Sequence, residues 1–176
     1  MTGQLHLAPE RPADAPLADA LIARAFGPGR YAKAAERLRE GSSPIAGLSF
    51  VAWTRGRAAG CVRLWPIVIG GAPAVLLGPI AVDEAERNAG VGAALIQRAC
   101  DAARAAGHAL VLLVGDEPYF GQFGFARALH VRMPGPVDLR RVLVRALVSG
   151  AAEGLEGAVR AAPSERIAPA LALAAE

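Results

Sequence analysis

The stretch VDEAERNAGVGAALIQRACDAARAAGH, residues 82–108, places two closely spaced glycines at the start of a predicted helix. The apolar side chains of this helix recur at helical spacing: Leu95, Ile96, Ala99, Cys100 and Ala103. The pattern predicts an amphipathic helix over residues 91–106, with Gly107 at its C-terminal end. Glycine in a helix costs roughly 0.5–1 kcal/mol relative to alanine, so Gly90 and Gly92 indicate that another group approaches this backbone closely.

The position of these glycines favours an anion-binding loop. The first N–H groups of a helix have no partner within the helix and carry the positive end of its dipole. Glycines let a phosphate reach those groups without a steric clash, and Arg87 adds a positive charge to the same loop. Residues 87–92, RNAGVG, are therefore interpreted as a cradle for a pyrophosphate. The alternative is that the glycines only let the helix pack closely on a sheet.

Two common phosphate-binding motifs do not match this loop. A P-loop has the pattern GxxxxGK[ST], and the one lysine of the chain, Lys33, lies elsewhere. A dinucleotide fingerprint, GxGxxG, follows a strand almost directly. Here Leu95 replaces the third glycine, and seven residues separate Val82 from Gly90. Both departures argue against NAD.

Runs with strand or helix character surround the loop on both sides. In chain order they are a strand at 4–11, helices at 13–27 and 30–41, strands at 48–56, 58–71 and 72–83, the helix at 91–106, and strands at 109–116, 125–133 and 140–150. Short turns between the first strands predict antiparallel pairing. The strand–helix–strand unit around the loop predicts two parallel neighbours. The fold class is therefore α/β, with a mixed sheet, antiparallel N-terminal strands, a central βαβ unit and a C-terminal end like a β-hairpin.

The length of 176 residues is that of one domain. We expect the domain to occupy residues 1–150. The remaining residues, 151–176, are rich in alanine and are expected to form a C-terminal extension that is helical or partly disordered.

The loop and its surroundings resemble the GNAT superfamily of N-acetyltransferases. Residues 87–92 are similar to the family's R/Q-x-x-G-x-G/A loop, which follows a strand and opens a long helix. LLGPIAVD resembles the family's fourth strand and ALVLLVGD its fifth. The turn YFGQFGF is similar to the Tyr/Phe-Gly-x-Phe-Gly-Phe turn of one bacterial branch. The resemblance covers residues 76–128 without a break.

The resemblance implies acetyl-CoA as the cofactor and assigns residues to it. The loop that would bind the pyrophosphate through its amides consists of Arg87, Asn88, Ala89, Gly90, Val91, Gly92 and Ala93. The backbone of Ile80, Ala81 and Val82 would pair with the pantetheine arm. The fourth and fifth strands would splay apart, and the thioester would lie between them. A backbone N–H at Val82 or a neighbour would serve the oxyanion.

The proton donor departs from the family pattern. Many members carry a tyrosine four residues before the Gly-Phe pair, and that position here is Phe120. Its neighbour Tyr119 is the candidate catalytic residue, which would protonate the leaving thiolate; water is the alternative. The predicted activity is acetyl transfer to a primary amine of a small molecule or a protein. The alternative is an inactive or weakly active CoA-binding sensor of the same fold.

Composition limits the partners. The formal charge of +3 and the 5% aromatic content, without a basic block, argue against nucleic acid. Isolated histidines and two distant cysteines predict no metal site. The absence of a long apolar span or a signal peptide predicts a cytoplasmic protein that does not bind membranes. A homodimer is expected through the apolar late strands. The acceptor is expected to bind to the N-terminal helices and the late strands.

Overall fold

The structure, a computed structural model, describes residues 4–163. The strands are β1 (His6–Pro9), β2 (Phe50–Thr54), β3 (Arg57–Ile69), β4 (Ala72–Val82), β5 (Leu110–Val114), β6 (Ala126–Arg127), β7 (Val131–Arg132), β8 (Val142–Ala146) and β9 (Gly157–Ala161). The α-helices are α1 (Ala15–Phe26), α2 (Ala34–Arg37), α3 (Val91–Ala105) and α4 (Glu117–Phe120). Single 3₁₀ turns lie at Pro12–Asp14, Pro28–Ala32, Glu84–Glu86, Gly121–Phe123 and Leu139–Arg141.

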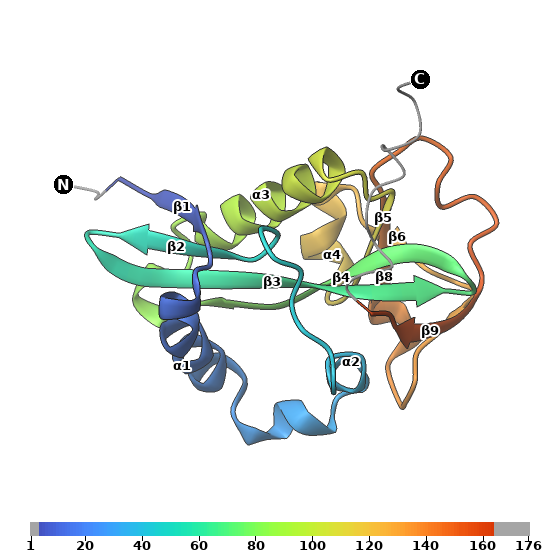
Figure 1. Ribbon diagram of the computed structural model, residues 1–176, viewed down its shortest axis with the longest axis horizontal. Helices are drawn as coiled ribbons and strands as arrows, with labels where there is room; N and C mark the ends of the chain where they lie inside the picture. The colour runs from blue at the N-terminus through green and yellow to red at the C-terminus, as the bar shows by residue number, and fades with distance from the viewer. Residues whose placement is uncertain (1–3, 164–176) are drawn as a thin grey trace.

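The strands form one mixed sheet, with the order β1-β2-β3-β4-β5-β8-β6 (Figure 1). Neighbours from β1 to β4 are antiparallel, β5 runs parallel to β4, and β8 and β6 are again antiparallel. The predicted fold class is therefore confirmed: the chain passes through α3 between its two parallel strands, and a late antiparallel strand closes the sheet against β5.

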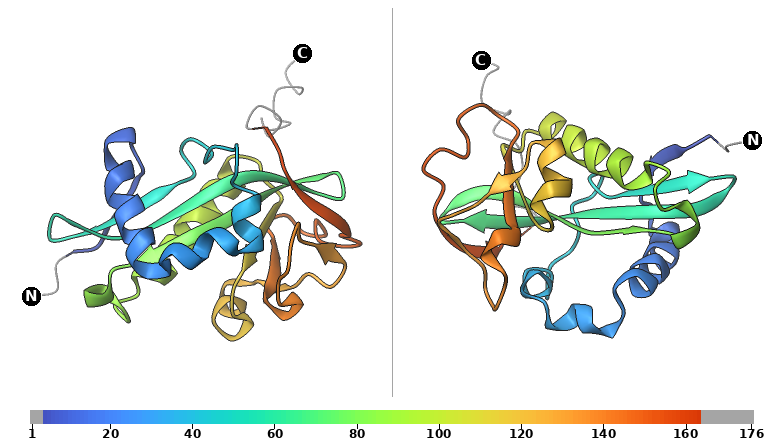
Figure 2. Two further views of the ribbon diagram at one scale, coloured as in Figure 1. Left: turned by 90° about the horizontal axis from the view of Figure 1, so that it is seen from below. Right: turned by 180° about the vertical axis from the view of Figure 1, so that it is seen from behind.

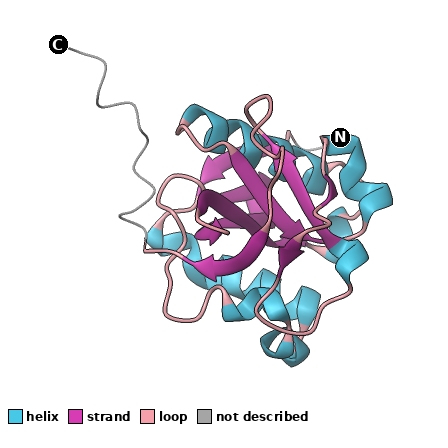
Figure 3. Ribbon diagram, turned by 90° about the vertical axis from the view of Figure 1, so that its right-hand side faces the viewer, coloured by secondary structure: helices cyan, strands magenta, loops and turns pink. Residues whose placement is uncertain are grey.

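Helices cover both faces of the sheet, with α3 and α4 on one face and α1 and α2 on the other (Figures 1 and 2). The view along the molecule shows the strands enclosed between them (Figure 3). Side chains alternate across a strand, so Phe50 and Ala52 of β2 join the core under α3 with Leu95. Val51 points to the opposite face and packs with Leu21 of α1.

The parallel strands β4 and β5 separate after a short contact. Their register contains only the pairs Val75–Val111 and Leu76–Leu112, although β4 continues to Val82. The other edge of β4 stays paired with β3 as far as Val82. The backbone of β4 beyond Leu76 therefore has one edge free of strand pairing within the described residues, and the expected splay is present.

Three segments differ from the expectations. The predicted strand at 125–133 is divided into two short strands: β6 pairs with β8, and β7 pairs with β9. The predicted helix at 30–41 is only a 3₁₀ turn, Pro28–Ala32, followed by the short α2, because Lys33 between them adopts an extended conformation. Part of the expected C-terminal extension is a strand, β9, and not a helix: it pairs with β3 and buries Val159. The expectation of disorder for residues 164–176 lies outside the described residues.

Candidate functional site

The N-terminus of α3 presents free backbone donors at the surface. Gly90 caps the helix in the left-handed region, with φ of 78°, and Asn88 also has a positive φ, 65°. These two residues turn the chain sharply into the helix. Within residues 4–163, the N–H groups from Gly90 to Ala93 donate to no protein acceptor. Together with the helix dipole, these four amides form an anion-binding geometry.

Gly92 lies under the hydroxyl of Tyr119. A Cβ placed on Gly92 would be 3.1 Å from Tyr119 Oη and 3.6 Å from Val82 Cγ2. The end of β4, the start of α3 and the short helix α4 therefore meet at this glycine. No side-chain hydrogen bond within the described residues engages the Tyr119 hydroxyl, and burial raises the pKa of this tyrosine. The hydroxyl is protonated and available to a ligand at neutral pH.

The side chain of Arg87, in the loop before α3, is accessible to a ligand. Its guanidinium lies 3.9 Å from a Glu84 oxygen, with both side chains exposed, which is a weak surface pair. Asp83 accepts a hydrogen bond from the Ala85 N–H and fixes the turn that precedes the loop. Arg87 is therefore an exposed positive charge next to the free amides.

The end of β4 presents backbone groups to the gap between the strands. Asp83 donates its N–H to Ala59 of β3, so the two-residue period of a strand turns the N–H of Val82 toward the opposite edge. The side chain of Ala81 is buried beneath α1, whereas Ile80 lines a cavity in the gap.

This cavity, of about 290 Å³, opens where β4 and β5 diverge. Its walls come from β4 residues 76–80, from the end of β5, from the α1–α2 region and from the loop before β8. Phe120 also lines it and packs over Gly115, where a Cβ would overlap the ring. Phe120 is thus an apolar wall of the cavity, and Tyr119 faces the start of α3.

Among the described residues that line the cavity, four carry a positive charge, Arg30, Lys33, Arg39 and Arg141, and one carries a carboxylate, Asp138. Burial lowers the pKa of Arg39, and its hydrogen bond with Glu36 partly offsets this effect. An arginine nevertheless keeps its charge in a protein. The cavity therefore carries a positive field next to the strand gap.

A sequence profile of the acetyltransferase (GNAT) family matches residues 18–127. The chain belongs to this family. It is 32% identical over 154 residues to the uncharacterised N-acetyltransferase YhbS of Escherichia coli strain K12, covering 85% of this chain and 92% of YhbS.

Solved GNAT structures share the fold. The crystal structure of Escherichia coli YhbS in complex with CoA superposes with a TM-score of 0.76 at 31% identity, over 91% of each chain. A GNAT acetyltransferase from Brucella melitensis in complex with acetyl-CoA gives a TM-score of 0.59 at 27% identity, over 85% of this chain and 98% of that one.

The sequence predicted that the loop, the end of β4 and Tyr119 form one site, and in the structure these three segments lie side by side. It did not identify the cationic wall of the cavity. Arg30, Lys33 and Arg39 lie in the segment predicted as one helix, residues 30–41, and only the fold of the chain brings them to the strand gap. The one available signal was the expectation that the N-terminal helices bind the acceptor. Within residues 4–163 no metal-binding cluster occurs, and no helix there is long and apolar enough to cross a bilayer.

Proposed function

We propose that the protein transfers an acetyl group from acetyl-CoA to a primary amine by direct attack. The observation that carries this proposal is the set of free amides from Gly90 to Ala93 beside the unpaired edge of β4. Membership in the GNAT family and the CoA and acetyl-CoA complexes of the two similar structures support it.

The cofactor is assigned to two surfaces. The pyrophosphate would lie on the loop from Arg87 to Ala93, and the pantetheine arm would pair with the backbone from Ile80 to Val82. Each contact of an anion with a helix terminus contributes about 0.3–1 kcal/mol, up to ~2 when partly buried. Micromolar affinity requires roughly 8 kcal/mol. The loop alone is therefore too weak, and binding requires the strand-like contacts along β4.

The chain supplies two groups for the chemistry. The amine attacks the thioester carbonyl, and the N–H of Val82 is the proposed donor to the oxyanion, because it points into the gap between β4 and β5. As the C–S bond breaks, Tyr119 is the proposed proton donor to the thiolate, because its hydroxyl is protonated and makes no side-chain hydrogen bond within the described residues. The amine nitrogen loses its proton to water, and water returns a proton to the Tyr119 phenolate. Phe120 contributes no proton; it excludes water from the cavity.

The direct test is CoA release from acetyl-CoA in the presence of amino acids, polyamines, aminoglycosides and peptide N-termini, with mass spectrometry of the products. We expect an acetylated amine and stoichiometric thiol. Tight acetyl-CoA binding without any acetylated product across this panel would instead support the CoA-binding sensor.

A further inference from the structure

The cationic wall of the cavity contains charges without protein partners. Asp138, the carboxylate on this wall, is already held by Arg140 at 2.8 Å, and Arg141 pairs with Asp116 at 3.1 Å. Arg39 pairs with Glu36 at 2.9 Å, which leaves Arg30 and Lys33 as the lining cations without a carboxylate partner within residues 4–163. The wall therefore carries an excess of positive charge that the described part of the protein does not neutralise.

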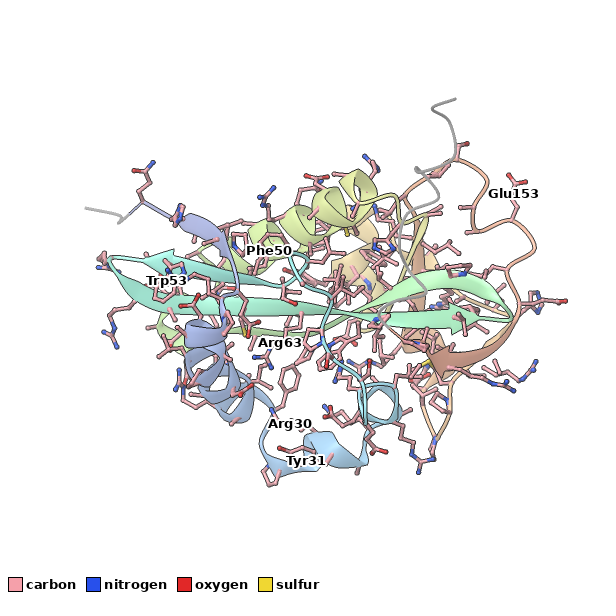
Figure 4. All side chains as sticks on the ribbon, in the orientation of Figure 1. Arg30, Tyr31, Phe50, Trp53, Arg63 and Glu153 are labelled. Atoms are coloured by element: carbon pink, nitrogen blue, oxygen red, sulfur yellow. The ribbon has the colours of Figure 1, made fainter. Side chains whose placement is uncertain are left out.

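Arg30 and Lys33 are held over aromatic rings. Arg30 lies 4.6 Å from the ring centre of Tyr31 and donates to its hydroxyl at 2.6 Å, and Lys33 lies 5.1 Å from the ring centre of Phe26. Neither forms a salt bridge with a carboxylate within residues 4–163. Figure 4 shows Arg30 and Tyr31 on the segment between α1 and α2, on the face of the sheet opposite to α3. Cation–π contacts restrain these side chains without cancelling their charge.

Arg39 offers a pair of parallel donors. Its side chain is 13% exposed, and Nη1 bonds to Glu36 at 2.9 Å. Within residues 4–163, Nε is buried without a hydrogen-bond partner and no hydrogen bond engages Nη2. Nη2 lies 3.1 Å from a Cβ built on Gly78. Burying an unpaired donor is costly, so the free Nε–Nη2 edge indicates a missing acceptor.

Arg63 shows what this edge binds in the same chain. Its Nε and Nη2 hold the two oxygens of Glu10 at 2.9 and 2.6 Å. Such a fork matches a carboxylate or a phosphate. Gly78, which Arg39 approaches, lies two residues beyond the last pair of β4 and β5. An anion bound by Arg39 is therefore next to the strand gap.

We propose that the acceptor is a primary amine that carries a carboxylate or a phosphate, and that Arg39 binds this anion. The inference rests on the proposed function and adds the class of its acceptor. Lys33 and Arg30 strengthen the positive field, and apolar residues such as Phe26 and Val137 pack against the uncharged part of the molecule. Polyamines and aminoglycosides, which carry only positive charge, are excluded by the same field.

Matched amines test the class by binding. We would titrate the protein, saturated with CoA, with leucine and phenylalanine against their methyl esters, with O-phosphoethanolamine against ethanolamine, and with spermidine, by calorimetry. The amino acids report on a carboxylate and O-phosphoethanolamine on a phosphate. We expect at least one anionic amine to bind about tenfold or more tightly than its neutral counterpart, and spermidine not to bind.

Variants test the residue. A lost hydrogen-bonded charge weakens binding about 10- to 100-fold, so Arg39→Gln should remove the preference for the anion. Lys33→Gln changes an exposed residue, so it should weaken anion binding without affecting folding. This second variant tests the proposal even if Arg39→Gln is unstable. Arg39→Lys should restore part of the binding. Arg132→Gln, an exposed arginine on β7 away from the cavity wall, should behave as the wild type.

Acetyl transfer to the same amines separates the two proposals. Selective binding of anionic amines without transfer would leave the anion site intact and overturn the acetyltransferase function. Three results would overturn the anionic acceptor. The first is that neutral amines or spermidine bind or react as well as the anionic amines, and the second is that no amine binds. The third is that the binding of the anionic amines is unchanged in both Arg39→Gln and Lys33→Gln.

Discussion

Tyr119 of the turn after β5 packs against Gly92 at the start of α3, and a Cβ built on Gly92 would lie 3.1 Å from Tyr119 Oη. The contact explains why position 92 has no side chain: both the hydroxyl and the helix amides need this space. Position 90 requires glycine for a different reason. A Cβ there would meet no other atom, but the φ of 78° is a conformation that residues with side chains rarely adopt.

Tyr119→Phe removes only the hydroxyl. We expect kcat for acetyl transfer to fall by about 10²–10⁴-fold, the usual contribution of general acid catalysis, with little change in acetyl-CoA affinity. Phe120→Tyr added to this variant should restore part of kcat, because it places a hydroxyl on the cavity wall. An unchanged kcat in Tyr119→Phe would remove the catalytic role.

The pH profile provides a second readout for Tyr119. Burial disfavours the phenolate and raises the pKa above its ordinary value near 10. The alkaline fall in kcat that depends on Tyr119 should therefore have its midpoint above pH 10. A fall centred well below pH 10 that disappears in Tyr119→Phe would contradict the raised pKa.

Gly90→Ala tests the backbone reason at position 90. A left-handed conformation costs an L-residue roughly 1–2 kcal/mol, so Tm should fall by a few degrees. Gly121→Ala is the matched control, because Gly121 also has open surroundings but a φ of −59°. An equal Tm in the two variants would contradict the strain.

The helices and strands that a local sequence pattern determines could be predicted. These are the strands β2 to β5 and the helix α3. The apolar period of α3 and the continuous apolar run of β5 are local properties of the sequence. Strand β9 was missed because GAVRA has no strong strand signal of its own. It forms because β3 and β7 provide pairing edges and the core buries Val159, which are long-range effects. The cationic cavity was missed for the same reason.

The crossing of β9 over the β3–β4 turn depends on two glycines. A Cβ on Gly70 would overlap the Glu156 carbonyl oxygen, and one on Gly157 would lie 2.6 Å from Gly70 Cα. Gly70→Ala should therefore lower the unfolding midpoint far more than Gly71→Ala, where φ is also positive but nothing lies within 4 Å. Equal losses of stability, measured by urea unfolding, would contradict this contact.

At the scale of the whole molecule, we propose that one sheet provides the sites of two ligands. The proposed cofactor loop lies at the start of α3, whereas α1 and α2 cover the opposite face of the sheet (Figure 2). The cavity proposed for the acceptor is lined by the α1–α2 region and also by Phe120 of α4. The gap between β4 and β5 connects them. The homodimer and the cytoplasmic location remain predictions.

Truncation tests the predicted division into residues 1–150 and 151–176, against which the pairing of β9 with β3 argues. A chain that ends at residue 150 loses β9 and exposes its pairing edge on β3, so we expect it to be strongly destabilised or insoluble. A chain that ends at residue 163 keeps all described contacts and should unfold like the full chain. Equal stability of both truncations would show that β9 is dispensable.

Acetyl-CoA binding tests the central claim most directly, by the Tm of the wild type and of Gly92→Val with increasing acetyl-CoA. A ligand at 100 times its Kd stabilises the native state by about 2.7 kcal/mol, roughly 5–10 °C for a domain of this size. We expect this shift in Tm for the wild type and for the control Gly121→Ala. The shift should be much smaller in Gly92→Val, because the valine side chain would cover the amides at the start of α3. No shift of the wild type at millimolar acetyl-CoA, or an equal shift in Gly92→Val, would contradict cofactor binding at the start of α3.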